Sequence, residues 1–195
     1  MARPREFDEQ LAVEKAMQLF WRRGYQAASL NELLDAMDLS RSSFYETWGT
    51  KREALIEALN RYAQSGMAGL IEPLTRADAG RAQIEQTFHG MVRRALSDGG
   101  AKGCLVNNCL AELAGQDAKL LQQLQDIRKG LERLLARAIR KGQIDGTIDP
   151  TQSATTLARF LASTFSGLNL TARAQPGKAV LNDIVRTALR ALDPR

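Results

Sequence analysis

Apolar residues recur every three or four positions along most of the chain, which is the period of an amphipathic α-helix. The alternating pattern typical of β-strands does not occur. The sequence therefore predicts an all-α protein of about nine helices. They are expected near residues 8–23, 30–37, 41–47, 51–71, 81–97, 104–113, 117–141, 151–170 and 178–192.

Glycine and proline residues suggest where these helices begin and end. Gly24 is expected to end the first helix, and Gly142 the longest one. Pro73 is expected to interrupt the helix that begins at residue 51, because proline lacks the backbone N–H that a helix interior needs. Pro150 suits the start of the following helix.

Residues 29–51 have the pattern of two short helices joined by a tight turn. Ser29 and Glu32 have the spacing of a capping box, in which each side chain bonds the other residue's backbone N–H. Asp38 stands in the turn, where a residue that tolerates positive φ is needed. Ser40 then caps the second helix. This pattern predicts a helix-turn-helix, whose second helix enters the major groove of DNA.

The second helix buries Phe44 and keeps a polar face suited to DNA. Arginine bonds guanine or phosphate, hydroxyls bond base edges or phosphates, and a carboxylate accepts from the amine of cytosine. The candidates on this helix are Ser40, Arg41, Ser42, Ser43, Tyr45, Glu46 and Thr47. Further candidates for phosphate are Tyr25, Ser29 and Lys51, and Arg3 and Arg5 form a basic arm for phosphates or the minor groove.

The segment LFWRRGYQAASLNELLDAMDLSRSSFYETWGTKREAL, residues 19–55, resembles the DNA-binding domain of the TetR/AcrR family of transcriptional regulators. Asp38 departs from a frequent glycine, and Glu46-Thr47 depart from common small or aromatic residues. The resemblance implies a helix-turn-helix domain over residues 1–50 and a larger helical domain for effector binding and dimerisation over 51–195. It also implies a repressor that binds a palindromic operator as a homodimer and is released by a small molecule.

The last two predicted helices carry apolar residues on more than one face. Such a helix pair commonly packs on a second copy of itself, and members of the resembled family pair through their last two helices. The alternative is that the chain's own helices cover both faces. The predicted interface residues are Leu157, Leu161, Phe165, Leu168, Leu181, Ile184, Val185 and Ala188.

The resemblance places an effector pocket among the middle helices, about residues 53–142. Candidate lining residues are His89, Cys104, Asn107, Asn108 and Glu112. Cys104 lies at a predicted helix start beside Lys102, and both features lower the pKa of a thiol. Its Gly-Cys-Leu segment resembles one found in family members that respond to electrophiles or oxidants through cysteine. A small buried apolar residue is the alternative reading.

Composition narrows the function classes. The formal charge of +5 in 195 residues agrees with a nucleic-acid partner. No run reaches the roughly 18 apolar residues of a membrane span, and residues 1–7 lack the apolar run of a signal peptide, so a cytoplasmic protein is expected. Two cysteines make a disulfide framework implausible, and one histidine gives no support to a histidine metal site. No cofactor is expected.

Two other function classes stay open at this point. A small helical enzyme is one, although the chain has no Ser/His/Asp set, zinc-protease motif or phosphate loop. A dimeric scaffold with a degenerate DNA-binding head is the other. Binding of generic duplex DNA that weakens with salt separates the DNA-binding regulator from both.

Overall fold

The computed structural model describes residues 7–97, 102–113 and 115–194. Over these ranges it is all-helical, with ten α-helices, one π-helical turn (η1) and no strand, which confirms the predicted fold class. The helices are α1 Glu9–Arg23, α2 Leu30–Met37, α3 Arg41–Trp48, α4 Lys51–Arg61, α5 Ala68–Thr75, α6 Arg81–Ala95, α7 Leu105–Leu113, α8 Ala118–Ile144, α9 Ala154–Arg173 and α10 Lys178–Arg190, with η1 at Tyr62–Gly66.

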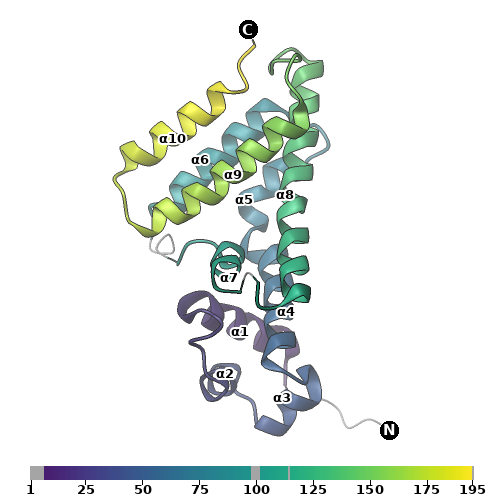
Figure 1. The fold of residues 1–195 in the computed structure, drawn as a ribbon, viewed down its shortest axis with the longest axis vertical. Helices are drawn as coiled ribbons and strands as arrows, with labels where there is room; N and C mark the ends of the chain where they lie inside the picture. Colours follow the sequence, from purple (N-terminus) through teal and green to yellow (C-terminus); the bar gives the residue numbers. More distant parts are fainter. Residues whose placement is uncertain (1–6, 98–101, 114, 195) are drawn as a thin grey trace.

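Helices α1, α2 and α3 form a small head at one end of the molecule (Figure 1). At the other end α5, α6, α8, α9 and α10 pack into a larger bundle. Helix α4 leads from the head into the bundle and contacts α1 and α3 as well as α8. Helix α7 lies between the two parts, beside α1. The head is therefore attached to the bundle through α4 and α7.

The turn signals read from the head's sequence are confirmed. Ser29 and Glu32 form the reciprocal capping box, and Asp38 ends α2 in the left-handed conformation at φ 59°. The hydroxyl of Ser40 accepts from the Ser43 N–H at 3.1 Å, which starts α3. Thr50 caps α4 in the same way. These local bonds set the angle at which α3 leaves α2.

The stretch from Lys51 to Thr75 differs from the single helix that was predicted. It divides at η1, which raises the number of α-helices to ten, and Pro73 lies inside α5 rather than interrupting it. The wider π-turn holds the buried side chain of Tyr62. At the end of this turn, the Gly66 carbonyl accepts a hydrogen bond from the Arg94 guanidinium at 2.7 Å. Tertiary contacts, rather than proline, divide this helix.

Two other predicted helix ends are wrong. Gly142 is buried inside α8, and the helix continues past it to Ile144. The Ile148 side chain packs so closely on it that a Cβ there would lie 2.6 Å away. Helix α9 begins at Ala154 rather than near 151. Before it, Asp149 accepts from the Thr151 backbone N–H and hydroxyl at 2.9 and 2.6 Å, which fixes a turn instead of a helical start.

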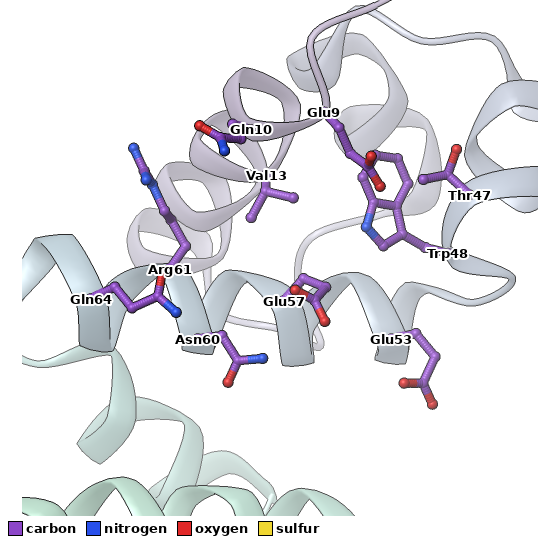
Figure 2. Close-up of a pocket in the computed structure, with 10 residues that line it drawn as sticks. All are labelled: Glu9, Gln10, Val13, Thr47, Trp48, Glu53, Glu57, Asn60, Arg61 and Gln64. Carbon is purple, nitrogen blue, oxygen red and sulfur yellow. The ribbon is translucent and has the colours of Figure 1, made fainter. Parts of the chain in front are cut away.

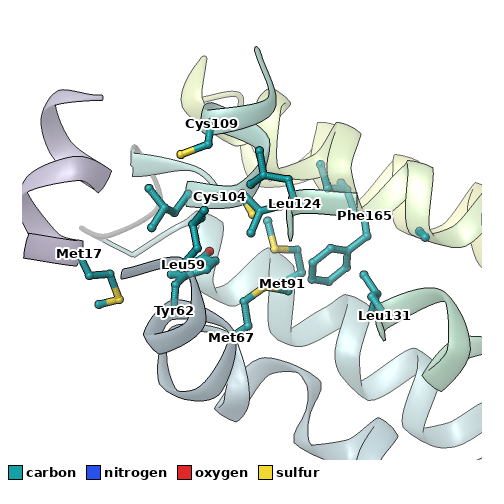
Figure 3. Close-up of a cluster of buried hydrophobic side chains, with 14 of the residues drawn as sticks. Met17, Leu59, Tyr62, Met67, Met91, Cys104, Cys109, Leu124, Leu131 and Phe165 are labelled. Carbon is teal, nitrogen blue, oxygen red and sulfur yellow. The ribbon is translucent and has the colours of Figure 1, made fainter. Parts of the chain in front are cut away.

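One buried apolar cluster runs through the whole molecule. It includes Phe20 and Phe44 in the head and Leu59 on α4, and it continues into the bundle. Figure 3 shows part of it, with Tyr62, Met91 and Phe165 among the side chains that fill the space between helices. Head and bundle therefore share a core. None of the helices in the described ranges is both long and apolar enough to cross a membrane.

We expect Asp38→Gly to stabilise the protein by about 0.5–1 kcal/mol, because glycine adopts positive φ without the steric cost that other residues meet. Thermal unfolding followed by circular dichroism measures the change. The control is Asp35→Gly, one turn earlier inside α2, which should destabilise by roughly 0.3 kcal/mol, the difference in helix propensity between Asp and Gly. A melting temperature lowered equally by both substitutions would contradict the assignment of strain to Asp38.

Candidate nucleic-acid interface and adjoining groove

Helix α3 presents an exposed polar face. Phe44 and Trp48 are buried and hold the helix on the head, while Arg41, Ser42 and Glu46 are exposed. Tyr45 is 46% exposed. One face of α3 therefore packs on the head and the opposite face is open to solvent. A helix that enters a major groove needs this arrangement.

Two of the predicted contact residues on α3 are partly engaged within the protein. Ser43 and Thr47 are half-buried. The Thr47 hydroxyl donates to the Ser43 carbonyl at 2.9 Å, and the hydroxyls of Ser43 and Ser40 lie 2.9 Å apart. The Ser42 hydroxyl also lies 2.9 Å from that of Ser40, although Ser42 itself is exposed.

Asn31 was not among the sequence candidates. Its side-chain oxygen, in the first turn of α2, accepts from the Arg41 guanidinium at 2.8 Å. This bond fixes the direction in which Arg41 leaves α3. Nothing in the residue pattern marks Asn31, because the contact joins two different helices.

Tyr25 and Lys51 lie together at the edge of the head. The Lys51 ammonium is 4.5 Å from the centre of the Tyr25 ring, a cation–π contact. Burial lowers the pKa of Lys51, and the carboxylates of Glu112 and Glu32 partly offset this. Ser29 is exposed nearby at the start of α2. Arg3 and Arg5 lie outside the described residues.

A groove of about 590 Å³ lies between α1, α3 and α4 (Figure 2). Glu9, Glu53 and Glu57 line it, together with Asn60 and Gln64. The three carboxylates outnumber the single guanidinium of Arg61, so this side of the head repels the DNA backbone. The favourable side is the exposed face of α3.

A groove of about 600 Å³, which we call the α1–α7–α9 groove, lies where the head meets the bundle. It gathers four of the five predicted effector-site residues. It is lined by Trp21, Arg22, Arg23, Gly24, Cys104, Asn107, Asn108, Ala111, Glu112, Ser166, Gly167, Asn169, Leu170 and Arg173. Helices α1 and α9 form two of its walls, in addition to α7 from the middle helices of about residues 53–142.

The two asparagines of the groove are tied into its walls. Asn108 donates to the Lys102 carbonyl at 3.0 Å and accepts from the Arg173 guanidinium at 3.0 Å. Asn107 donates to the Ser166 carbonyl at 3.4 Å. His89 lies elsewhere, exposed on α6 in a shallow pocket beside α10, so the structure does not place it with the other candidates.

Cys104 directly precedes α7, as predicted, but its surroundings differ from those expected. The Lys102 ammonium lies over the Trp21 ring, 5.3 Å from its centre, and donates to the Gln18 side-chain oxygen at 3.4 Å. Cys104 is only 6% exposed and packs in the buried cluster beside Tyr62 (Figure 3). Burial raises the pKa of Tyr62, and the neighbouring Cys104 adds to this effect. Cys109 is more deeply buried, and burial raises its pKa to about 12.

The residues predicted for the dimer interface are, with one exception, buried within the single chain. Those at most 4% exposed are Leu157, Leu161, Phe165, Leu168, Leu181, Val185 and Ala188, whereas Ile184 is half-buried. The prediction is wrong for these seven residues, because α9 and α10 pack on each other and on α6 with these faces. The chain's own helices cover them, which was the alternative.

A different face of α9 and α10 is open. Phe160 and Leu170 on α9 are 46% and 70% exposed, and Val180 on α10 is 47% exposed. Ser163 and Gly167 lie between the two α9 residues at helical spacing and are also exposed. In the described part of the chain, no group of three or more His, Cys, Asp or Glu side chains is placed to hold a metal ion.

Known proteins match both parts of this architecture. The family model "Bacterial regulatory proteins, tetR family" matches residues 12–59, and "Tetracyclin repressor-like, C-terminal domain" matches residues 78–188. The HTH-type transcriptional regulator YezE of Bacillus subtilis is 30% identical over 99% of this chain and 100% of its own. The chain belongs to the TetR family of bacterial transcriptional regulators.

Other relatives agree with this assignment. The HTH-type transcriptional repressor ComR of Escherichia coli is 29% identical to this TetR-family regulator over 96% of the chain and 90% of its own. A solved structure of a cysteine mutant of the TetR-family regulator CifR, in complex with a 26-base-pair operator duplex, superposes with a TM-score of 0.84. It is 33% identical and covers 97% of this chain and 99% of its own. The chain is thus a regulator rather than an enzyme.

We expect maleimide to label both cysteines of this TetR-family regulator slowly in the native state, and Cys104 before Cys109. Cys104 lines a groove, whereas the pKa of about 12 leaves Cys109 almost entirely protonated near pH 7.5, and the thiolate is the reactive form. Mass spectrometry of the wild type and of Cys104→Ser measures the two rates. Labelling of Cys109 first, in the folded protein, would contradict the structure.

Proposed function

We propose that this chain is a transcriptional repressor that binds a palindromic operator as a homodimer and is released by a small molecule. The observation that carries the proposal is the exposed polar face of α3, held at a fixed angle by the Ser29 and Ser40 caps. That face is a protein surface of the size and chemistry that the major groove accepts. Operator binding also implies a cytoplasmic location.

The proposed DNA contacts fall into two classes. Arg41 and Glu46 read base edges, since both are exposed on α3 and carry the groups that bond guanine and cytosine. Tyr45, Tyr25, Ser29 and Lys51 bind phosphates, supported by the free N–H groups at the starts of α2 and α4. The exposed Ser40 and Ser42 and the half-buried Ser43 and Thr47 complete the surface, and Arg3 and Arg5 are assigned to the arm.

The proposed dimer forms through the open face of α9 and α10 that carries Phe160, Leu170 and Val180. Exposed apolar side chains on helices favour burial against a like surface, and Ser163 and Gly167 allow two helices to approach closely. A two-fold pairing of this kind also suits a two-fold symmetric operator. In this arrangement residues 1–50 bind DNA and residues 51–195 pair and respond to the effector.

The proposed effector site is the α1–α7–α9 groove. Its volume of about 600 Å³ suits a small organic molecule, and its asparagines and arginines supply polar contacts. A molecule that binds only a displaced arrangement of the head shifts the protein away from the DNA-bound state by its difference in binding free energy. A covalent trigger is the second candidate, because Cys104 also lines this groove: an electrophile or oxidant that modifies the thiol would act at the same place.

Selection of binding sites from a random duplex library tests the proposal. A repressor of this kind enriches one sequence, and binding to it weakens steeply as salt rises because phosphate contacts release counterions. A scaffold with a degenerate head binds no duplex. Salt-dependent binding without an enriched sequence would reject an operator-specific regulator.

We expect Arg41→Ala and Glu46→Ala to change the sequence recovered in this selection, since each removes a base contact worth about 1–3 kcal/mol. Lys51→Ala and Tyr45→Ala should weaken binding by a similar factor for all sequences, because phosphate contacts carry no base information. Circular dichroism first establishes that each variant is folded. An unaltered sequence profile for both Arg41→Ala and Glu46→Ala would reject their assignment as base readers.

We expect Phe160→Glu or Leu170→Glu to convert the dimer to monomers, because burying an unpaired charge costs several kcal/mol, roughly, in addition to the lost apolar contact. Sedimentation at micromolar concentration measures the state. Ile144→Glu is the matched control, since Ile144 is 82% exposed at the end of α8, outside the open α9–α10 face. Dimers that survive both test substitutions would place the interface elsewhere.

A further inference from the structure

Glu112 belongs to α7, yet its carboxylate is bonded to the head. It accepts the backbone N–H of Tyr25 at 2.9 Å with one oxygen and that of Gln26 at 2.5 Å with the other. Both amides lie in the turn between α1 and α2. Hydrogen bonds to an ionised acceptor are about twice as strong as neutral ones, so this contact is a firm link between α7 and the head.

The turn is shaped to receive this carboxylate. Gly24 has φ +85°, and a Cβ there would lie 3.1 Å from a Glu112 oxygen. Any larger residue would therefore be strained in its backbone and crowd the carboxylate. Gln116, one turn beyond Glu112, adds a second link by accepting from the Gln26 side chain at 2.9 Å.

The turn held by Glu112 leads directly to proposed DNA contacts. Tyr25 itself lies against Lys51, and Ser29 follows three residues after Gln26. A shift of the turn would move the Tyr25 ring and so disturb its cation–π contact with the Lys51 ammonium. The position of these groups relative to α3 thus depends on a side chain from outside the head.

We propose that Glu112 is a positioning residue for operator binding. It does not contact DNA; it fixes the α1–α2 turn so that Tyr25, Ser29 and Lys51 meet the phosphates together. Because Glu112 also lines the α1–α7–α9 groove, a group that draws its carboxylate into the groove loosens the turn and weakens DNA binding. This inference rests on the proposed function and names the residue that couples its two sites.

Glu112→Gln tests the proposal through the sign of its effect. The amide has a single acceptor oxygen and turns an NH2 group toward one of the two backbone N–H groups, so the turn is released. Affinity for the selected duplex, measured by fluorescence anisotropy, should fall on the order of tenfold, about 1.4 kcal/mol. Simple electrostatics predicts the opposite, since removing a negative charge near phosphates tightens binding.

The matched control is Glu72→Gln, which makes the same charge change at an exposed residue of α5 and should leave affinity within about twofold. Hydrogen exchange followed by mass spectrometry gives a second readout. In Glu112→Gln, exchange should quicken in the peptide that contains Tyr25 and Gln26, while peptides of α8 and α9 keep their protection.

Equal or tighter DNA binding by Glu112→Gln would overturn the proposal. Weaker binding together with faster exchange throughout α8 and α9 would also overturn it, because the loss would then reflect unfolding of the bundle. A wild-type chain that selects no duplex would reject the proposed function itself. That failure appears without any variant and is therefore distinct from a failure of the Glu112 inference.

Discussion

Helix α4 packs against both ends of the molecule, and the rest of the structure depends on that shared packing. Its buried Leu55 and Leu59 belong to the same apolar cluster as Phe20 of the head and Phe165 of the bundle. Because interiors are close-packed, the head cannot tilt without disturbing side chains beyond α4. For the same reason, a change of packing in the bundle is expected to shift the position of α3.

Polar contacts near the junction of α7 and α8 also connect the two parts of the molecule. Asp117 caps α8 and takes a two-point ion pair from Arg52 at the start of α4, with one contact at 2.9 Å, and this pairing holds the pKa of Asp117 well below its usual range. Glu112 holds the α1–α2 turn a few residues earlier. One short stretch of chain thus holds both the α1–α2 turn of the head and the start of α4.

The sequence predicted those features that depend on neighbouring residues. The capping box at Ser29, the left-handed Asp38 and the start of α3 at Ser40 follow from side chains within a few positions of one another. The helical period likewise gave the fold class. Gly142 was misread as a helix end because its role is set by Ile148 packing against it, which only the folded chain reveals.

Features that join distant segments were predicted poorly. The pattern of α9 and α10 showed that both are rich in apolar residues but not which face meets the chain's own helices, so Phe165 and Leu181 were assigned to a partner although they lie in the core. Four of the candidate effector residues line one groove, but the residue pattern does not predict the bond from Glu112 to Tyr25. A glutamate on a helix gives no sign of a partner so far away along the chain.

The most direct test of the account is hydroxyl-radical footprinting of the protein on its selected duplex. The account predicts two protected segments related by two-fold symmetry and separated by about one helical turn or a multiple of it, roughly 34 Å each, as expected for two copies of α3 in successive major grooves. A single unsymmetrical protected segment, or protection spread evenly along the duplex, would contradict it.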